Sequence, residues 1–319
     1  MTAFILRSTE LERDFGQIAA WFSILEDEPT SEPRLVEYYE KHRERIIQKV
    51  AEDEQGQLVG FCWVIRQRLE PELAYIHLFI KPEERGQGIG RRLYEDLIQI
   101  TEKTQVKQLR VNILDTCPEC QTFAEQRGFA VRRHQIKMVL DLAAFEDQPY
   151  EKVITKLRGE GFQFTSMEAL GNTEEAQRKL YTLNYTTDIE TLGSNGKPAW
   201  DSFEDFQKSV CQSDWYKPEG QIVAIETATG AWVAMCAITR IDWHDHHANI
   251  LYTGVNTQYR GRKLGQAVKV LALRYARDVL KADMVYTDNN AQNLPIIAIN
   301  RKLGYTPLPG TFLMEKVLE

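Results

Sequence analysis

The chain has 319 residues, of which 43% are hydrophobic and 10% aromatic, so its size favours two packed domains and its composition argues against general disorder. Its formal net charge of -7 argues against a general nucleic-acid binder, because phosphate contacts require clustered Lys and Arg. Residues 1–15 contain no apolar signal-peptide core, and no segment approaches the roughly 20 apolar residues of a membrane span. We therefore expect a cytoplasmic protein that binds neither nucleic acid nor membrane.

The apolar periodicity predicts two similar successions of helices and strands. In the first half we expect, in chain order, helices at 11–25 and 33–50, strands at 58–66 and 74–80, a helix at 90–103, a strand at 108–114, a short helix and a last strand at 137–142. In the second half we expect helices at 173–184 and 201–211, strands at 221–226, 231–241 and 248–255, a helix at 265–280, a strand at 284–287, a short helix and a last strand. The shared order indicates a duplicated domain.

Four sequence landmarks recur at nearly the same spacing, which supports the duplication. The glycine-rich hexads 85–90 and 260–265 begin 175 residues apart, and the tetrapeptides 59–62 and 233–236 begin 174 residues apart. The other two pairs, each 176 residues apart, are Gly128-Phe129 with Gly304-Tyr305, and Met138 with Met314.

Each hexad lies between a predicted strand and a predicted helix, which makes it a candidate anion site. The free backbone N–H groups of a helix N-terminus point at a bound anion, and glycine lets a phosphate approach the backbone closely. Neither hexad ends in the Gly-Lys-Ser/Thr of a Walker loop, and neither follows the first strand of a βαβ unit, as a dinucleotide fold requires. Tight turns alone would explain one glycine-rich hexad, but they explain two in register poorly.

The hexads resemble a known family. Arg85-Gly86-Gln87-Gly88-Ile89-Gly90 resembles the Q/R-x-x-G-x-G/A signature with which GNAT acetyltransferases bind the pyrophosphate of acetyl-CoA, and Arg260-Gly261-Arg262-Lys263-Leu264-Gly265 is similar, with Lys263 in place of a glycine. The Gly-aromatic pairs resemble the end of the family's second CoA-contacting helix. The two-domain layout resembles tandem GNAT proteins such as mycothiol synthase.

The resemblance covers the C-terminal two thirds of each half and implies an α/β (α+β) fold class. We expect two tandem GNAT folds, each a mixed, mostly antiparallel sheet flanked by helices. The polar stretch 146–149 contains a proline and follows the last predicted strand of the first half, so it predicts the boundary. We place the two domains at residues 1–145 and 152–319.

The resemblance also implies acetyl-CoA as cosubstrate, without a metal, and indicates which residues contact it. In the first half these are Phe79, Ile80, Arg85, Gly86, Gln87, Gly88, Ile89 and Gly90; in the second they are Val255, Arg260, Gly261, Arg262, Lys263, Leu264, Gly265, Asn293 and Asn300. Backbone N–H groups near Ile80 or Val255 are expected to polarise the thioester carbonyl while the acceptor amine attacks it directly in a ternary complex.

The expected catalytic side chains are missing from both halves. Some GNAT enzymes carry a glutamate base six residues before the end of the strand, where this chain has Ala74 and Asn249. The family's frequent tyrosine acid is replaced by Ala124 and Asn300. Another side chain or a water must therefore transfer the protons, or one half only binds.

We predict that the second half is the catalytic one. Its Asn293 and Asn300 offer polar contacts to a CoA chain, whereas the first half has Cys117 and Ala124 at these positions. The cleaner signature of the first hexad is the observation against this assignment.

Two further polar motifs have alternative interpretations. His244 and Asp242 belong to the His-rich segment 242–247 and are candidate bases at the acceptor site, but a polar hairpin turn is the simpler interpretation. Cys117 and Cys120 have C-x-x-C spacing, but no second cysteine pair supports zinc binding or redox chemistry. The five cysteines are odd in number in a long chain, so we expect no disulfide framework. They are Cys62, Cys117, Cys120, Cys211 and Cys236.

Aromatic residues are dense between positions 200 and 216. They either line an acceptor pocket or pack the helices of the second half. These residues are Trp200, Phe203, Phe206, Trp215 and Tyr216.

The sequence thus predicts an acyl-CoA-dependent N-acetyltransferase that transfers acetyl to a primary amine of a small molecule, with the C-terminal domain catalytic. One alternative is a non-catalytic acyl-CoA-binding or regulatory protein, which the missing tyrosine and glutamate support. Another is a protein N-acetyltransferase, although no sequence feature marks a peptide groove. A mycothiol-related function rests on layout alone and is not adopted.

Overall fold

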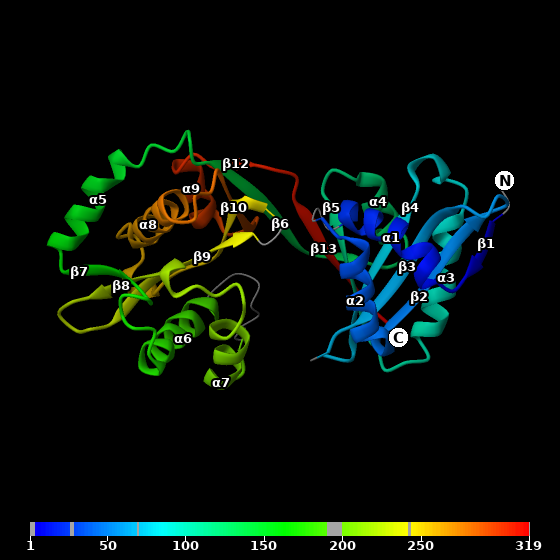
Figure 1. The fold of residues 1–319 in the computed structure, drawn as a ribbon, viewed down its shortest axis with the longest axis horizontal. Coiled ribbons are helices and arrows are strands. Elements are labelled where there is room, and N and C mark those ends of the chain that lie inside the picture. The colour runs from blue at the N-terminus through cyan, green and yellow to red at the C-terminus, as the bar shows by residue number, and fades with distance from the viewer. Residues whose placement is uncertain (1–3, 26–28, 69, 190–199, 242–243, 319) are drawn as a thin grey trace. The chain divides into compact units, whose positions relative to one another are not determined.

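The computed structural model describes residues 4–25, 29–68, 70–189, 200–241 and 244–318. The chain divides into two compact units, one made of Met1–Arg132 with Thr311–Glu319 and the other of Arg133–Gly310. Each unit is a mixed, mostly antiparallel sheet with helices on both faces, which confirms the predicted fold class (Figure 1). Within the described segments, no helix has both the length and the apolar character needed to cross a bilayer.

The first unit has the strand order β1-β2-β3-β4-β5-β13, and β4 and β5 are parallel while the other neighbours are antiparallel. The strands are β1 (Phe4–Arg7), β2 (Ile46–Asp53), β3 (Leu58–Arg66), β4 (Leu73–Ile80), β5 (Gln108–Leu114) and β13 (Thr311–Val317). The helices are α1 (Leu11–Leu25), α2 (Glu32–His42), α3 (Ile89–Thr101) and α4 (Pro118–Glu125).

Strand alternation gives the first unit a core on each face of its sheet. Phe61 and Trp63 of β3 belong to a cluster with residues of α1 and α2, whereas Cys62 and Val64 belong to a cluster with residues of α3. Both faces are apolar, so β3 reads as a continuous hydrophobic run and is buried on both sides.

The second unit has the strand order β6-β11-β10-β9-β8-β7, and β12 pairs with β6. The strands are β6 (Ala130–Asp141), β7 (Phe162–Ser166), β8 (Gln221–Glu226), β9 (Trp232–Ile241), β10 (His244–Val255), β11 (Met284–Asn290) and β12 (Thr306–Pro307). The helices are α5 (Gln148–Gly159), α6 (Glu174–Ile189), α7 (Phe203–Phe206), α8 (Leu264–Asp278) and α9 (Leu294–Lys302). In Figure 1, α6 and α7 lie on one side of the strands and α5, α8 and α9 on the other.

The two halves exchange their last strands, so the units differ from sequential domains at 1–145 and 152–319. Strand β6, at the end of the first half, pairs with β11 and β12 of the second. Strand β13, at the end of the chain, pairs with β5 of the first half. Met138 is buried in the second core and Met314 in the first. The two landmarks carry the same residue type at equivalent positions, which is why the exchange keeps both cores filled.

The helix predicted at 33–50 is shorter than expected. Helix α2 ends at His42, and Ile46–Asp53 form β2. Ile46 and Val50 pair with Ile65 and Phe61 of β3. The pairing of Ile46–Asp53 with the buried strand β3 outweighs the helical spacing of the apolar residues in this segment. Its β-branched side chains also favour a strand.

Met314→Ala tests the strand exchange. Met314 is completely buried in the first core, so the substitution should destabilise the first unit by about 2–5 kcal/mol. Hydrogen exchange should show lost protection in β5 and retained protection in β11. Val317→Ala, at a position 64% exposed, serves as the control and should change protection little. Lost protection confined to β11 would contradict the pairing of β13 with β5.

Candidate functional site

The two glycine hexads form loops with the same backbone conformation. Gly86 and Gly261 have φ angles of 79° and 78°, and Gly88 and Lys263 have φ angles of 87° and 66°. Gly88 and Lys263 are also the N-cap residues of α3 and α8. Lys263 therefore occupies a left-handed position that glycine fills in the other loop, at a cost of about 1–2 kcal/mol for a residue with a Cβ.

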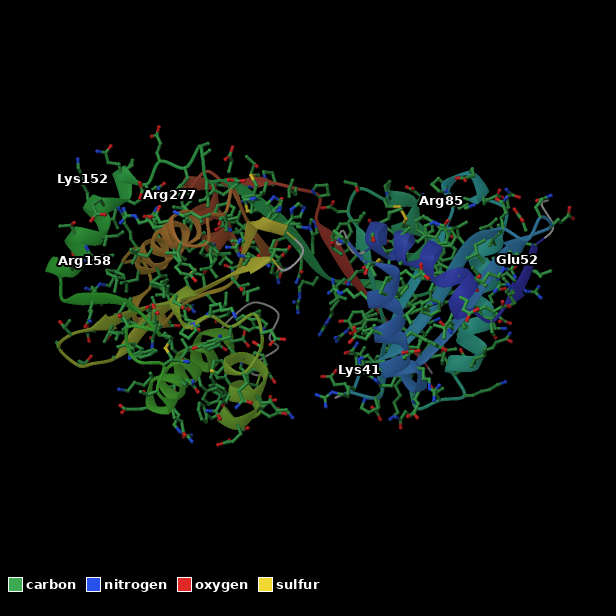
Figure 2. The ribbon with its side chains drawn as sticks, viewed as in Figure 1. Lys41, Glu52, Arg85, Lys152, Arg158 and Arg277 are labelled. Carbon is green, nitrogen blue, oxygen red and sulfur yellow. A yellow bond between two sulfur atoms is a disulfide. The ribbon has the colours of Figure 1, made fainter. Side chains whose placement is uncertain are left out.

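An arginine ties each loop to the strand before it. Arg85 Nε donates to the Ile80 carbonyl at 3.3 Å, and Arg260 Nε donates to the Val255 carbonyl at 3.1 Å. The guanidinium of Arg85 also contacts Glu119 of α4 at 3.3 Å (Figure 2). The contacts to Ile80 and Val255 confirm that the two loops are structural equivalents.

Several residues expected to contact the cofactor have buried side chains, so only their backbone can serve a ligand. Ile89 and Leu264 are 1% exposed. A Cβ at Gly265 would lie 3.1 Å from Val255 and 3.7 Å from Ile299, so the helix start packs directly on the strand end. These helix starts direct the backbone N–H groups of their first turns outward, as an anion site requires.

The strand before each loop separates from its parallel neighbour. The ladder between β4 and β5 joins Leu73–Tyr75 to residues 108–110, and β4 continues to Ile80. The ladder between β10 and β11 ends at Ile250 and Thr287, whereas β10 continues through an irregularity at Ile250/Tyr252 to Val255. The separated strand end presents backbone groups that a ligand can pair.

A basic groove borders the glycine loop of the second unit, and all of its lining residues belong to that unit. It has a volume of about 570 Å³ and lies between α5 and the loop (Figure 2 labels Lys152). Its lining residues are Lys152, Val153, Lys156, Leu157, Glu160, Gly261, Arg262 and Lys263. The lining carries four cationic side chains and one carboxylate, Glu160, which lies 3.7 Å from Lys156 and 3.6 Å from Arg262. The excess of positive charge beside a helix N-terminus suits a polyphosphate ligand.

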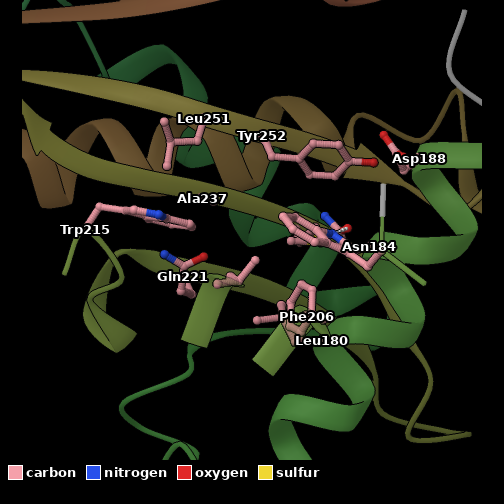
Figure 3. Close-up of a pocket in the computed structure, with 12 residues that line it drawn as sticks. Leu180, Asn184, Asp188, Phe206, Trp215, Gln221, Ala237, Leu251 and Tyr252 are labelled. Carbon is pink, nitrogen blue, oxygen red and sulfur yellow. Dashed lines mark hydrogen bonds between the residues drawn. The ribbon is translucent and has the colours of Figure 1, made fainter. Parts of the chain in front are cut away.

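An aromatic pocket of about 190 Å³ lies on the opposite side of β10, against α6 (Figure 3). Its lining residues are Leu180, Asn184, Asp188, Trp200, Phe206, Val210, Trp215, Gln221, Met235, Ala237, Leu251 and Tyr252. Of the dense aromatic residues, Trp200, Phe206 and Trp215 thus line a pocket, while Phe203 and Tyr216 are buried in helix packing.

Strand register explains why the second unit has this pocket. In the first unit, Trp63 pairs with His77 and Phe61 with Phe79. The pair equivalent to Trp63 and His77 is Ala237 and Tyr252, and the pair equivalent to Phe61 and Phe79 is Met235 and Gly254. The indole of Trp63 is therefore replaced by the methyl group of Ala237, which lines the pocket. The place of the Phe79 ring is taken by Thr187 of α6, whose Oγ1 lies 2.5 Å from a Cβ built at Gly254.

The same space in the first unit is filled by aromatic rings. Trp21 of α1 stacks on Phe61 and Phe79, with ring centroids 5.9 Å and 5.1 Å apart. Trp63 is completely buried, and its ring lies 5.2 Å from that of Phe22. The predicted contact residue Phe79 is thus a core residue whose side chain does not face a ligand.

The asparagines expected to contact CoA have structural partners. Asn293 is the N-cap of α9, and its side chain accepts a hydrogen bond from the Ile296 amide at 3.4 Å. Asn300 is completely buried, and its Nδ2 lies 3.7 Å from the Met138 sulfur. Its Oδ1 has no hydrogen-bond partner among the described residues, and Asn289 Nδ2 on β11 has none either. Both atoms are buried and both residues are at most 8% exposed, so the side chain of Asn300 is not accessible to a ligand, contrary to the expectation.

The candidate base His244 does not reach the pocket. It stands at the start of β10, stacked on His247 at 4.0 Å, while Val255 ends the same strand. His244 pairs with Ile241 and Val255 with Ala234 of β9, so the two ends of β10 lie roughly 23 Å apart at about 3.3 Å per residue. Asp242 lies outside the described residues. The pocket's own carboxylate is Asp188, which no sequence motif marked.

Cys117 and Cys120 form a disulfide at the start of α4. This differs from the expectation that the cysteines form no disulfide framework. The remaining cysteines, Cys62, Cys211 and Cys236, are free thiols. The C-x-x-C pair is therefore present as an oxidised pair in which neither sulfur is a thiolate.

Polar groups without partners gather beneath the second loop. Lys269 of α8 is completely buried, its Nζ lies 5.4 Å from the Tyr305 ring, and burial lowers its pKa to about 8. Neither Lys269 Nζ nor the Tyr305 hydroxyl has a hydrogen-bond partner within the described part of the chain. Burial also raises the pKa of Tyr305, so the pair is held in its uncharged forms above about pH 8.

Comparison with known proteins gives a consistent result. Residues 13–129 and 186–305 each match the sequence profile of the acetyltransferase (GNAT) family. The mycothiol acetyltransferase of Acidothermus cellulolyticus is 26% identical over 278 residues, which cover 83% of this chain and 78% of that protein. Two solved structures share the fold at lower sequence identity.

The first is a GCN5-related glucosamine N-acetyltransferase region in a fungal multi-domain GH3 β-N-acetylglucosaminidase, with a TM-score of 0.73 and 15% identity. The superposition covers 99% of this chain and 38% of that larger protein. The second is a tandem GNAT protein from the clavulanic acid biosynthesis pathway, with a TM-score of 0.64 and 17% identity, covering 99% and 98% of the two chains. At these identities the likeness shows the fold alone.

Reciprocal substitutions test the left-handed position of the two loops. Lys263→Gly should stabilise the second unit by about 1 kcal/mol, because it relieves the backbone and removes a cation from the positive end of a helix. Gly88→Lys should destabilise the first unit by a similar amount for the same two reasons, because steric contact is minor: Arg91 Nη2, at 3.9 Å, is the nearest atom to a Cβ built at Gly88. Urea unfolding of both variants measures the effect. Equal losses of stability in both would show that Lys263 is not strained.

The buried amine makes stability depend on pH. The folded pKa of Lys269 is about 8 and its ordinary value is 10.5, so the unfolded chain binds more protons between these values and stability rises with pH across that window. Lys269→Met should therefore stabilise the protein by about 3 kcal/mol below pH 8, and the gain should vanish by about pH 10.5. Lys179→Met, at a half-exposed side chain, is the control for urea unfolding across this range. A gain that does not change with pH would contradict this account.

Proposed function

The chain belongs to the GNAT family of acetyltransferases and is an N-acetyltransferase, and from this premise we propose that its second unit transfers acetyl from acetyl-CoA to a primary amine of a small molecule. The observation that carries the proposal is the arrangement around the end of β10. The glycine loop, α8 and the basic groove lie on one face of this strand end, and the aromatic pocket lies on the other. A donor and an acceptor bound there would meet at the separated strand.

The alternation of side chains along the strand end supports this arrangement. Val255 faces Gly265 of α8, while a Cβ at Gly254 would meet Thr187 of α6 at 2.5 Å. Thr187 Oγ1 also lies 2.8 Å from the Tyr252 hydroxyl. Two adjacent strand residues thus contact two different helices: Val255 contacts α8 on the donor side, and Gly254 contacts α6 on the acceptor side.

The residues divide the chemistry between them. The basic groove and the helix N-terminus would hold the phosphates of acetyl-CoA, whose thioester supplies the activated acetyl group. Backbone N–H groups near Val255 would polarise the thioester carbonyl. The acceptor nitrogen forms the new bond to the carbonyl carbon, the carbon–sulfur bond breaks, and the sulfur leaves with its electron pair. The second proton that the nitrogen loses goes to this thiolate and gives the free thiol of CoA. Asp188 is the pocket carboxylate that would take the proton of the acceptor ammonium.

The first unit supports a different role. Its glycine loop has the same backbone conformation as the loop of the second unit, but aromatic rings fill the space where an acceptor would bind. We propose that this unit binds acyl-CoA without transferring the acyl group. The small volume of the pocket in the second unit, about 190 Å³, favours a small-molecule acceptor over a protein N-terminus.

Matched aspartates in the two loops test the assignment. Gly261 and Gly86 have nearly equal φ angles, and no atom lies within 4 Å of a Cβ built at either. Asp tolerates this conformation better than most residues, so both variants should fold, and its charge should repel a pyrophosphate. Gly261→Asp should reduce turnover at least 10-fold, whereas Gly86→Asp should leave turnover within about twofold.

The measurements are calorimetric titration with acetyl-CoA and thiol release with an amine panel. Gly86→Asp should lose only the binding attributable to the first unit. Loss of turnover in Gly86→Asp with full activity in Gly261→Asp would move catalysis to the first unit. Binding of acetyl-CoA without turnover on any amine would favour a binding protein instead.

A further inference from the structure

We propose that the acceptor is a compact monoamine with an uncharged apolar body, bound with its ammonium group at the α6 end of the aromatic pocket. This inference rests on the proposed function, because it names the class of amine that the acceptor site takes. It depends on how polar and apolar groups are distributed in the pocket (Figure 3).

The polar groups of the pocket gather where α6 meets β10. Asn184 and Asp188 lie one turn apart in the last two turns of α6, and Thr187 between them contacts the Tyr252 hydroxyl at 2.8 Å. The negative end of the α6 dipole adds to the carboxylate of Asp188, so this end of the pocket favours a cation. It also adjoins Gly254 and Val255, where the thioester would lie. A cationic amine is thereby placed next to its reaction partner.

Aromatic faces border the same end. The Trp200 indole donates from Nε1 to Asn184 Oδ1 at 3.0 Å, which fixes the orientation of its ring. Tyr252 is held by its contact with Thr187. An ammonium group over such faces gains cation–π attraction in addition to its pairing with Asp188.

The rest of the pocket is apolar. Away from the α6–β10 end it is lined by Leu180, Phe206, Val210, Trp215, Met235, Ala237 and Leu251, with Gln221 as the remaining polar side chain. None of the described lining residues is Lys or Arg. A carboxylate or phosphate on the acceptor would therefore be desolvated without a cationic partner, which disfavours amino acids and phosphorylated amines. A second ammonium group would likewise find no second carboxylate among the described lining residues, which disfavours polyamines.

The volume limits the size of the apolar body. A dry cavity of about 150 Å³ holds one benzene molecule. The pocket of about 190 Å³ therefore has room for one ring, or a branched alkyl group, with a short aminoalkyl arm. Ala237 sets this volume, because the indole of Trp63 occupies the equivalent place in the first unit.

Calorimetric titration with matched ligands tests the class directly. 2-Phenylethylamine represents the class, phenylalanine adds a carboxylate to it, 2-phenylethanol removes its charge, and spermidine replaces the apolar body with further amines. We expect 2-phenylethylamine to bind at least 30-fold more tightly than phenylalanine and spermidine, and at least 10-fold more tightly than the alcohol. Phenylalanine or spermidine binding as tightly as 2-phenylethylamine would overturn the inference.

Two variants test the named residues. Asp188→Asn should weaken binding of 2-phenylethylamine at least 10-fold and reduce its preference over the alcohol, while Glu204→Gln, at a side chain 75% exposed outside the pocket, should change neither. Ala237→Trp should abolish amine binding while the affinity for acetyl-CoA stays within about twofold, which also shows that the variant is folded. Unchanged amine binding in Ala237→Trp would overturn the inference even if the Asp188 variant behaved as expected.

Thiol release with the same panel separates this inference from the proposed function. Acetylation of the monoamine with the expected preferences supports both. Acetylation of an amino acid or a polyamine at a higher kcat/KM than the monoamine would overturn the acceptor class and leave the transferase intact. Tight binding of the monoamine without acetyl transfer to any amine would support the pocket's specificity and contradict the proposed transferase.

Discussion

The separation of β10 from β11 after Ile250 is the constraint on which the second unit depends. A strand paired on both edges has no backbone group left for a ligand, and a strand end without support would not hold a position. Here the end of β10 is supported by a helix on each of its two faces. Val255 packs on Gly265 of α8, and Gly254 packs on Thr187 of α6. The approach at Gly254 requires glycine, because a Cβ there would lie 2.5 Å from Thr187 Oγ1, and a Cβ at Gly265 would lie a tight 3.1 Å from the Val255 side chain.

The two units show how one fold can carry two different sites. Their glycine loops agree in backbone angles to within about the scatter expected of one conformation, and their arginines make the same contact to the preceding strand. They differ in what fills the space beside the strand before the loop. In the first unit Trp21, Phe61 and Phe79 stack as a core, whereas in the second the small side chain of Ala237 leaves a pocket. The duplicated loops keep one backbone conformation, and packing decides which unit has a pocket beside the strand.

The glycine loop of the second unit also differs in charge from the glycine loop of the first unit. Lys263 accepts an unfavourable backbone conformation, and its ammonium joins those of Lys152 and Lys156 and the guanidinium of Arg262 around one groove. The first loop has glycine at that position. Strain tolerated at a ligand-binding loop is a common sign of function, and here the gain is a positive potential where a polyphosphate would bind.

The sequence alone determined the duplication, the order of elements, the fold class and the two loops, because these depend on local features. Glycine spacing, strand alternation and helical periodicity are all visible in short windows, and the repeat offset combined them into a family resemblance. The same offset also places Ala237 against Trp63, so the difference in bulk that opens the pocket is visible in the sequence once the halves are aligned. That this difference opens a pocket could be derived only from the structure, which shows on which face of the strand each residue lies.

The tertiary structure alone decided the rest, because the remaining features join residues far apart in the chain. The exchange of β6 and β13 could not be read from the sequence, since Met138 and Met314 suit either core. The His-rich segment that begins with Asp242 looked chemically capable, yet His244 lies at the far end of β10, and strand length rather than residue type excludes it from the pocket. Asp188 carries no motif and is selected only because α6 brings it to the end of β10. Local patterns record which conformations the backbone prefers, but a site is defined by which side chains the packed sheet and helices bring together.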